Sequence, residues 1–154
     1  MTDHDTRRLA DLVGAKHACL LQLRELGRRQ QELIATGDMT PLLMLLADKQ
    51  RAIGELHELE RRLDPFRSED PARRVWSGEA ERVHCASLAD QSARLLAEIL
   101  EVEKSCEESL RRRRDETAEQ LAVVQAAGTT RGAYVNADFN NYASTSTLDL
   151  TSEK

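Results

Sequence analysis

The stretch from Leu33 to Leu63 decides the fold and reads LIATGDMTPLLMLLADKQRAIGELHELERRL. Gly37 suits a helix end, because glycine enters the left-handed conformation without a steric penalty at Cβ. Thr40 then offers an N-cap oxygen for a second helix, and Pro41 fits its first position, where the missing N–H is no loss. These stop and start signals lie so close together that the two flanking helices must be antiparallel neighbours. The chain is therefore predicted to be built on a helical hairpin.

Helical periodicity extends outward from this hairpin in both directions. The first helix is expected over about residues 5–36, the second over 41–63 and the third over 75–126. Each carries an apolar stripe at three- and four-residue steps, which places the stripe on one helix face. The first stripe contains Leu9, Leu12, Val13, Cys19, Leu20, Leu23, Leu26, Leu33 and Ile34. The second contains Leu42, Leu45, Leu46, Ala52, Ile53, Leu56, Leu59 and Leu63, and the third contains Leu88, Leu95, Ile99, Val102, Cys106, Leu110, Leu121 and Val124.

Composition supports the same fold class. The 154 residues are 32% charged and only 3% aromatic, a mixture typical of long helices and coiled coils. We predict an all-α protein, with an antiparallel helical hairpin and a long third helix in a three-helix, coiled-coil-like bundle over residues 1–126. Phe66 and Trp76 are expected to plug the base of the hairpin.

The third helix is predicted to be much longer than the second, so its C-terminal part should extend past the Gly37 turn without a partner. Gly128 is expected to end it. Residues 127–154 are rich in Thr, Ser, Asn and Gly, which predicts a disordered, polar tail. Three of the five Phe, Tyr and Trp residues lie there, at Tyr134, Phe139 and Tyr142. Such side chains suit a short docking segment, although stray aromatics in a flexible end are an alternative.

Charge and length exclude several classes of function. A net charge of −5 argues against nucleic-acid binding. The sequence contains no run of about 18 apolar residues, so no membrane-spanning helix is predicted. The N-terminus lacks the features of a signal peptide, and the three cysteines are expected to be reduced thiols. These features together predict a cytoplasmic protein.

Catalytic and metal-binding patterns are incomplete. Glu81 and His84 have the spacing of a di-iron motif, but such bundles need two copies and further carboxylates. His57-Glu58 begins a zinc-protease motif that lacks its second histidine. The run Arg111–Arg114 is flanked by acidic residues, so a solvated, salt-bridged face is its default interpretation. We therefore expect no enzyme activity, no cofactor and no metal.

The layout resembles the FlgN family of flagellar type III export chaperones. Three features carry the resemblance: the end of the first helix, Leu33-Ile34-Ala35-Thr36-Gly37-Asp38; the Leu42–Leu63 segment, with Lys49-Gln50 inside its leucine repeat; and a long last helix before a polar, tyrosine-containing tail. The resemblance implies a small cytoplasmic helical protein. Such a protein holds the C-terminal helical region of flagellar hook-associated (hook–filament junction) proteins and delivers them to the export gate.

The resemblance also implies site residues. The last helix would take the cargo, at Leu110, Thr117, Leu121 and Val124. A tail tyrosine would dock at the export gate component, with Tyr134 as first candidate and Tyr142 as second. The all-apolar turn Leu42–Leu46 is a further candidate contact surface.

Two alternatives stay open at the level of sequence. One is a structural coiled-coil protein, in which the long helix pairs tightly with a second copy and binds no cargo. The other is a metal-binding bundle enzyme. A chaperone with an open apolar stripe is itself compatible with a weak homodimer.

Overall fold

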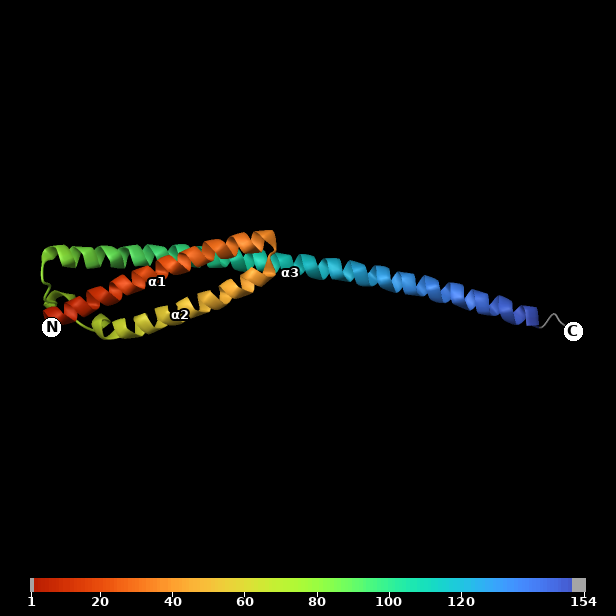
Figure 1. Ribbon diagram of the computed structural model, residues 1–154, viewed down its shortest axis with the longest axis horizontal. Coiled ribbons are helices and arrows are strands. Elements are labelled where there is room, and N and C mark those ends of the chain that lie inside the picture. The colour runs from red at the N-terminus through yellow and green to blue at the C-terminus, as the bar shows by residue number, and fades with distance from the viewer. Residues whose placement is uncertain (1, 151–154) are drawn as a thin grey trace. The chain divides into compact units, whose positions relative to one another are not determined.

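The computed structural model describes the backbone of residues 2–150 and the side chains of residue 2 and residues 4–136. Helix α1 spans Asp3–Thr36, α2 spans Met39–Arg67, a 3-10 turn η1 spans Pro71–Arg73, and α3 spans Glu79–Leu150 (Figure 1). No residue between 2 and 150 lies in a strand, which confirms the predicted all-α fold. The chain divides into two units, Met1–Leu110 and Arg111–Lys154. The first contains α1, α2, η1 and the beginning of α3.

The hairpin turn is closed by the predicted glycine. Gly37 adopts φ 76° and ψ 18°, and its N–H donates to the carbonyls of Leu33 and Ile34. The N–H of Asp38 also donates to Leu33, so orphan carbonyls at the end of α1 are satisfied. A β-carbon at Gly37 would be strained in this conformation.

The predicted start of the second helix was wrong by two residues. Its N-cap is Asp38 rather than Thr40, and α2 begins at Met39. Pro41 is therefore the third helical residue and not the first. The difference costs little, because none of the first four N–H groups of a helix has a partner within it.

The predicted end of the second helix was also wrong. Proline was expected to stop it near Leu63, but α2 continues to Arg67 with Pro65 inside its last turn. Only two helical residues follow Pro65, so little regular helix is disturbed. Phe66 is buried against the core, and Arg67 donates hydrogen bonds to Asp64 and Glu60. These contacts hold the last turn in place.

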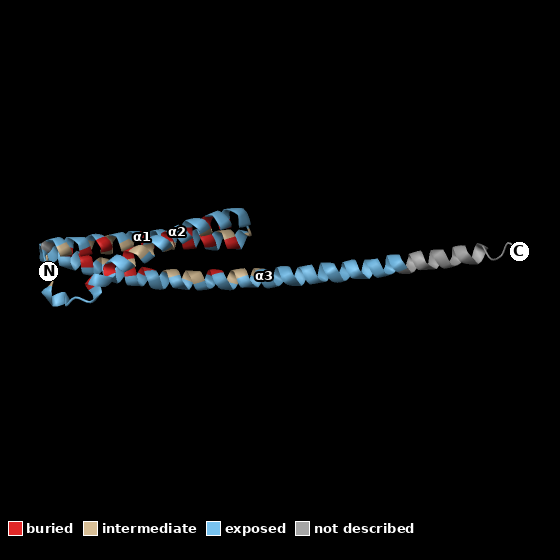
Figure 2. Cartoon of the chain, turned by 90° about the horizontal axis from the view of Figure 1, so that it is seen from below, coloured by how far each residue is buried: buried red, intermediate tan, exposed pale blue. Residues whose placement is uncertain are grey.

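The main hydrophobic core lies between α1 and α2 and is joined by α3. Helices α1 and α2 lie side by side, with many of their Cα atoms within 8 Å of one another. Buried residues follow the facing sides of these two helices and the first part of α3 (Figure 2). The buried members are Leu9, Leu12, Cys19, Leu20, Leu23, Leu26, Leu45, Ala52, Leu59, Leu63, Phe66 and Leu95. The predicted stripes of the first two helices are thereby confirmed, and Phe66 and Trp76 pack at this core as expected.

A smaller cluster forms near the hairpin turn. Ile34 of α1, Leu42 of α2 and Cys106 of α3 are buried together, with Leu110 half-buried against them. On α1, Gly27 faces Val102, and a β-carbon at Gly27 would lie 3.2 Å from the Val102 Cγ1 atom. The glycine therefore makes room for this part of α3.

Polar contacts across the core also connect the three helices. The Lys49 ammonium of α2 donates to the Gln30 side-chain oxygen of α1 at 2.9 Å, and it forms an ion pair with Glu103 of α3. Gln30 interrupts the apolar stripe of α1, and its buried partner explains why this polar side chain is tolerated. Farther out, Glu98 of α3 pairs with Arg24 and Arg28 of α1 at 3.7 and 3.6 Å.

The predicted end of the third helix near Ala126 was wrong. The structure continues α3 through Gly128 to Leu150, so the predicted tail of residues 127–154 has a helical backbone over 127–150. A single glycine inside a helix costs only about 1 kcal/mol relative to alanine. Thr129 and Thr130 donate their hydroxyl hydrogens to the carbonyls of Gln125 and Ala126, four residues earlier. The side chains from residue 137 onward, and residues 151–154, lie outside the described residues.

The three cysteines yield a first testable prediction. Cys19, Cys85 and Cys106 are all free and buried, and burial raises the pKa of each thiol above its usual value. Since the thiolate is the reactive form, a raised pKa and restricted access both suppress reaction. We expect all three to resist a disulfide reagent such as DTNB at pH 7–8 in the native protein and to react in denaturant. Rapid labelling of the native protein would contradict this packing.

Candidate binding faces

The outer part of α3 presents an uncovered apolar face. Thr117, Leu121 and Val124 follow one another at steps of four and three residues and therefore share one face of the helix. Val135 lies eleven residues after Val124, which is close to three full turns, so it extends the same face. The exposed fractions are 57% for Leu121 and 66% for Val124. Leu121 and Val124 are adjacent on this face, and neighbouring exposed apolar side chains mark interaction surfaces more often than isolated ones do.

Leu110 belongs to a different environment from the other three predicted cargo residues. It is half-buried against Ile34, Leu42 and Cys106 in the first unit. Thr117, Leu121 and Val124 lie in the second unit and are exposed. The structure therefore groups three of the four predicted residues on one exposed face and gives Leu110 a packing role.

The predicted docking tyrosine lies on the helix. Tyr134 is highly exposed and stands eleven residues after Val123, so these two side chains share a second face of α3. Tyr142 lies where the backbone is helical, but its side chain is outside the described residues. The sequence prediction missed Val123 and Val135. The spacing of Val135 would have identified it if the helix had been continued past Gly128, whereas Val123 lies within the predicted helix but outside its predicted stripe.

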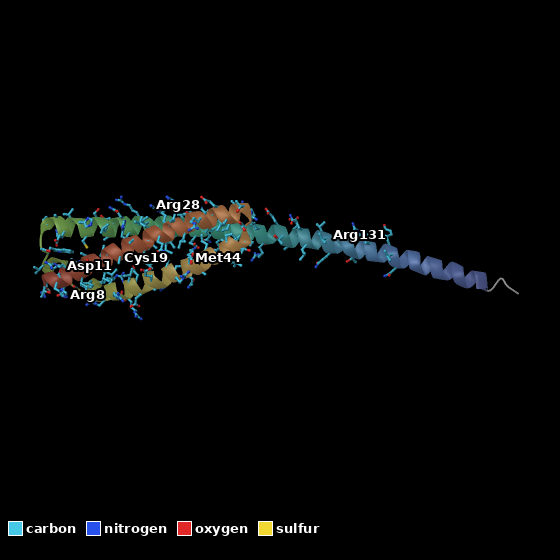
Figure 3. The ribbon with its side chains drawn as sticks, in the orientation of Figure 1. Arg8, Asp11, Cys19, Arg28, Met44 and Arg131 are labelled. Carbon is cyan, nitrogen blue, oxygen red and sulfur yellow. The ribbon has the colours of Figure 1, made fainter. Side chains whose placement is uncertain are left out.

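Basic residues flank the exposed apolar face. Residues 111–136 contain five arginines against three acidic residues, Asp115, Glu116 and Glu119. Arg114 contacts Asp115 at 3.3 Å, and both side chains are exposed to solvent. Arg131 lies farther along α3 (Figure 3). This distribution favours a partner whose apolar side chains are accompanied by acidic ones.

A second exposed apolar patch lies at the start of α2. Met39, Leu43 and Met44 are exposed, whereas Leu42 and Leu45 face the core. Met44 is labelled in Figure 3 on α2. Beside it, a cleft of about 300 Å³ is lined by Leu33, Pro41, Met44 and Leu45 together with Arg29, Glu32 and Asp48. In the apolar turn Leu42–Leu46, Leu42 and Leu45 therefore belong to the core, and Leu43 and Met44 belong to the surface.

No group of three or more His, Cys, Asp or Glu side chains is arranged to hold a metal ion in the part of the chain that the structure describes. Over the same described residues, no helix combines the length and the apolar composition needed to cross a membrane.

Comparison with known proteins gives no relative: no protein-family model matches the chain, and no curated protein or solved structure is significantly similar to it.

Proposed function

We propose that this protein is a cytoplasmic export chaperone without catalytic activity. It holds the C-terminal helical region of flagellar hook-associated proteins and delivers them to the type III export gate. The observation that carries the proposal is the exposed apolar face of α3 formed by Thr117, Leu121, Val124 and Val135. The resemblance of the Leu33–Leu63 segment to the FlgN family adds the identity of the cargo.

The mode of binding follows from the chemistry of this face. An exposed apolar surface is disfavoured in water by about 25 cal/mol per Å². An amphipathic helix of the cargo would cover it, with anchors at the same three- and four-residue spacing. The arginines at 111–114 and 131 would then meet acidic residues that flank the cargo's apolar stripe. On the second face of α3, exposed Tyr134 supplies a rigid contact for the export gate component, and Tyr142 is the second candidate.

A second candidate function uses the same face. A structural coiled-coil protein would pair Leu121 and Val124 with a second copy of α3, which would cover the same apolar area. The two functions predict homodimers of different stability. A chaperone should exchange any weak homodimer contact for cargo, whereas a structural coiled coil should stay dimeric at low micromolar concentration and ignore cargo peptides.

The test is a pair of α3 variants of the full-length protein. The variant Leu121→Asp/Val124→Asp places two carboxylates on the apolar face, and Ala126→Asp/Thr130→Asp places two on the opposite side of the helix, in the turns that follow. Binding is measured by calorimetry with a synthetic peptide from the C-terminal helix of a hook-associated protein. Losing two apolar anchors should weaken binding about 100-fold, from roughly 1.5 kcal/mol per buried side chain. The opposite-face variant should bind within about twofold of the unmodified protein.

The outcomes separate the hypotheses. Both variants should melt at the temperature of the unmodified protein, because Leu121 and Val124 are exposed in the structure. Unchanged peptide binding by Leu121→Asp/Val124→Asp would exclude this face, and the patch of Met39, Leu43 and Met44 would be tested next. Sedimentation at several concentrations decides the remaining alternative: a tight dimer that binds no peptide and dissociates in Leu121→Asp/Val124→Asp identifies a structural coiled coil.

A further inference from the structure

The first part of α3 carries an apolar stripe on its solvent side, in addition to the side that faces the core. The stripe consists of Ala86, Ala89, Ala93, Leu96 and Leu100, which alternate at steps of three and four residues. All five are exposed, Leu96 to 38% and Leu100 to 59%. Residues at this spacing share one side of a helix. The next position of the pattern is Glu103, and residues 86–103 are called the inner segment below.

Two members of the inner segment show where the stripe lies in the bundle. Glu103 forms an ion pair with Lys49 of α2. Ala89 lines a half-open cavity of about 180 Å³ together with Leu63 and Phe66 of α2. The stripe between Ala89 and Glu103 therefore runs along the side of α3 that adjoins α2. A fourth helix placed on this stripe would complete a four-helix bundle.

The same alternation of steps returns farther along α3, over residues 114–131, which are called the outer segment. Its positions are Arg114, Thr117, Leu121, Val124, Gly128 and Arg131, and all of them are exposed. Apolar residues in a seven-residue repeat are typical of a helix that pairs with another helix in a coiled coil. The chain thus holds two exposed segments of this kind, one within the first unit and one in the second.

We infer that the inner segment of one copy is covered by the outer segment of a second copy, which runs antiparallel to it. One register brings the apolar positions of the two segments together. In this register Leu96 faces Leu121 of the second copy, Ala93 faces Val124, Leu100 faces Thr117, and Ala89 faces Gly128. The small side chains of Ala89, Ala93 and Gly128 let the two backbones approach closely.

Charge selects this register and this direction. Glu103 faces Arg114 of the second copy, and the Arg114 side chain is 73% exposed, so it can reach the Glu103 carboxylate. A shift by one heptad would place Glu103 opposite Glu107 in one direction and opposite Leu121 in the other. A parallel pair in register would place Glu103 opposite Glu103 and Arg114 opposite Arg114. Like charges that face each other across a helix pair are disfavoured.

The inferred homodimer does not depend on the proposed cargo, because both segments belong to this chain. If both proposals hold, cargo and the second copy compete for Leu121 and Val124, and the dimer is the cargo-free form. The two proposals can fail separately, since the dimer is measured with the protein alone and cargo binding is measured with the peptide.

Sedimentation equilibrium of the full-length protein tests the inference. The expected Kd is on the order of 10 µM, because alanine and glycine fill several layers of the seam. Arg114→Glu should weaken the dimer at least about tenfold, whereas Arg112→Glu makes the same charge change on the opposite side of the helix and should leave it unchanged. Leu100→Asp should also weaken it at least about tenfold without lowering the melting temperature, because Leu100 is exposed. A monomer at about 200 µM, or equal effects of the two arginine variants, would overturn the inference.

Cysteine crosslinking tests the register. Full-length Leu96→Cys/Leu121→Cys should form a covalent dimer under mild oxidation, because the two cysteines face each other across the antiparallel seam. Leu96→Cys/Val124→Cys is the control and should crosslink much less, and the unmodified protein should not crosslink, because Cys19, Cys85 and Cys106 are buried. A covalent dimer of Leu121→Cys alone would indicate parallel pairing. A disulfide within one chain of Leu96→Cys/Leu121→Cys would indicate an outer segment that turns back on its own inner segment. Either result would contradict the inferred dimer.

Discussion

Replacing Leu20 with aspartate is expected to abolish the cooperative thermal unfolding transition of the helical bundle. Leu20 has an exposed fraction of 0% and lies in the main core between α1 and α2. An ionised carboxylate there would lose its hydration without gaining a partner, and its burial costs several kcal/mol. The same change removes a leucine whose truncation alone costs about 2–5 kcal/mol. A domain of this size has only about 5–15 kcal/mol of stability in total.

The adjacent residue supplies the control for Leu20→Asp. Leu21 is the next residue of α1 and is 37% exposed, so an aspartate there keeps its contact with water. Circular dichroism at 222 nm, followed with temperature, compares the two variants at equal concentration. Leu21→Asp should retain a single transition close to that of the unmodified protein. A native-like melt for Leu20→Asp would show that α1 faces the core in a different register.

The hairpin and its core were predictable because they depend on local signals. Gly37 ends α1 in the left-handed conformation, as glycine was expected to do. The apolar stripes of the first two helices identify the buried faces, since three- and four-residue spacing fixes which side chains share a face. The two ends of α2 were less predictable. Proline near a helix end is tolerated when the last turn is fixed by other contacts, as Phe66 and Arg67 do here.

The long-range pairings could not be predicted. Gln30 is a polar interruption of the apolar stripe, but nothing in the spacing of α1 indicates that Lys49 of α2 would reach it. Likewise, Arg74 lies before the start of α3 and Ser92 lies within it. Only the packing of the helices brings both residues to the lining of one cavity. Such contacts depend on the relative placement of helices, which periodicity does not define.

The exposed face of α3 could be predicted only in part from the sequence. Leu121 and Val124 were predicted as a partner-binding stripe from spacing and family resemblance, and the structure leaves both uncovered. Leu110 was grouped with them by the same spacing, yet it packs against Ile34 and Leu42. Spacing gives the face of a helix, but it does not say where along that face the bundle ends.

Removing the Glu103 carboxylate alone should destabilise the bundle more than replacing Glu103, Lys49 and Gln30 together by apolar residues. The Lys49 side chain is only 9% exposed and contacts Gln30 as well as Glu103. In Glu103→Leu the buried ammonium loses its counter-charge, which typically costs about 3–5 kcal/mol for a fully buried pair. Because the Glu103 side chain is 39% exposed, water screens part of the interaction, and we expect a loss of about 2–3 kcal/mol.

The double variant distinguishes this explanation from a general loss of contact with α3. In Glu103→Leu/Lys49→Met the buried charge is gone, and apolar replacements of similar volume are often neutral for such pairs. The double variant still leaves the buried Gln30 amide without its hydrogen bond, which lowers the free energy of unfolding by roughly 1–3 kcal/mol. Adding Gln30→Leu should restore this stability. Glu98→Leu is the control, because Glu98 and Arg28 are exposed and Arg24 is only half-buried, and pairs near the surface contribute about 0–1 kcal/mol. Urea unfolding measures each free energy. If the triple variant is less stable than Glu103→Leu, the buried triad stabilises the bundle and our assignment of the cost to an uncompensated charge is wrong.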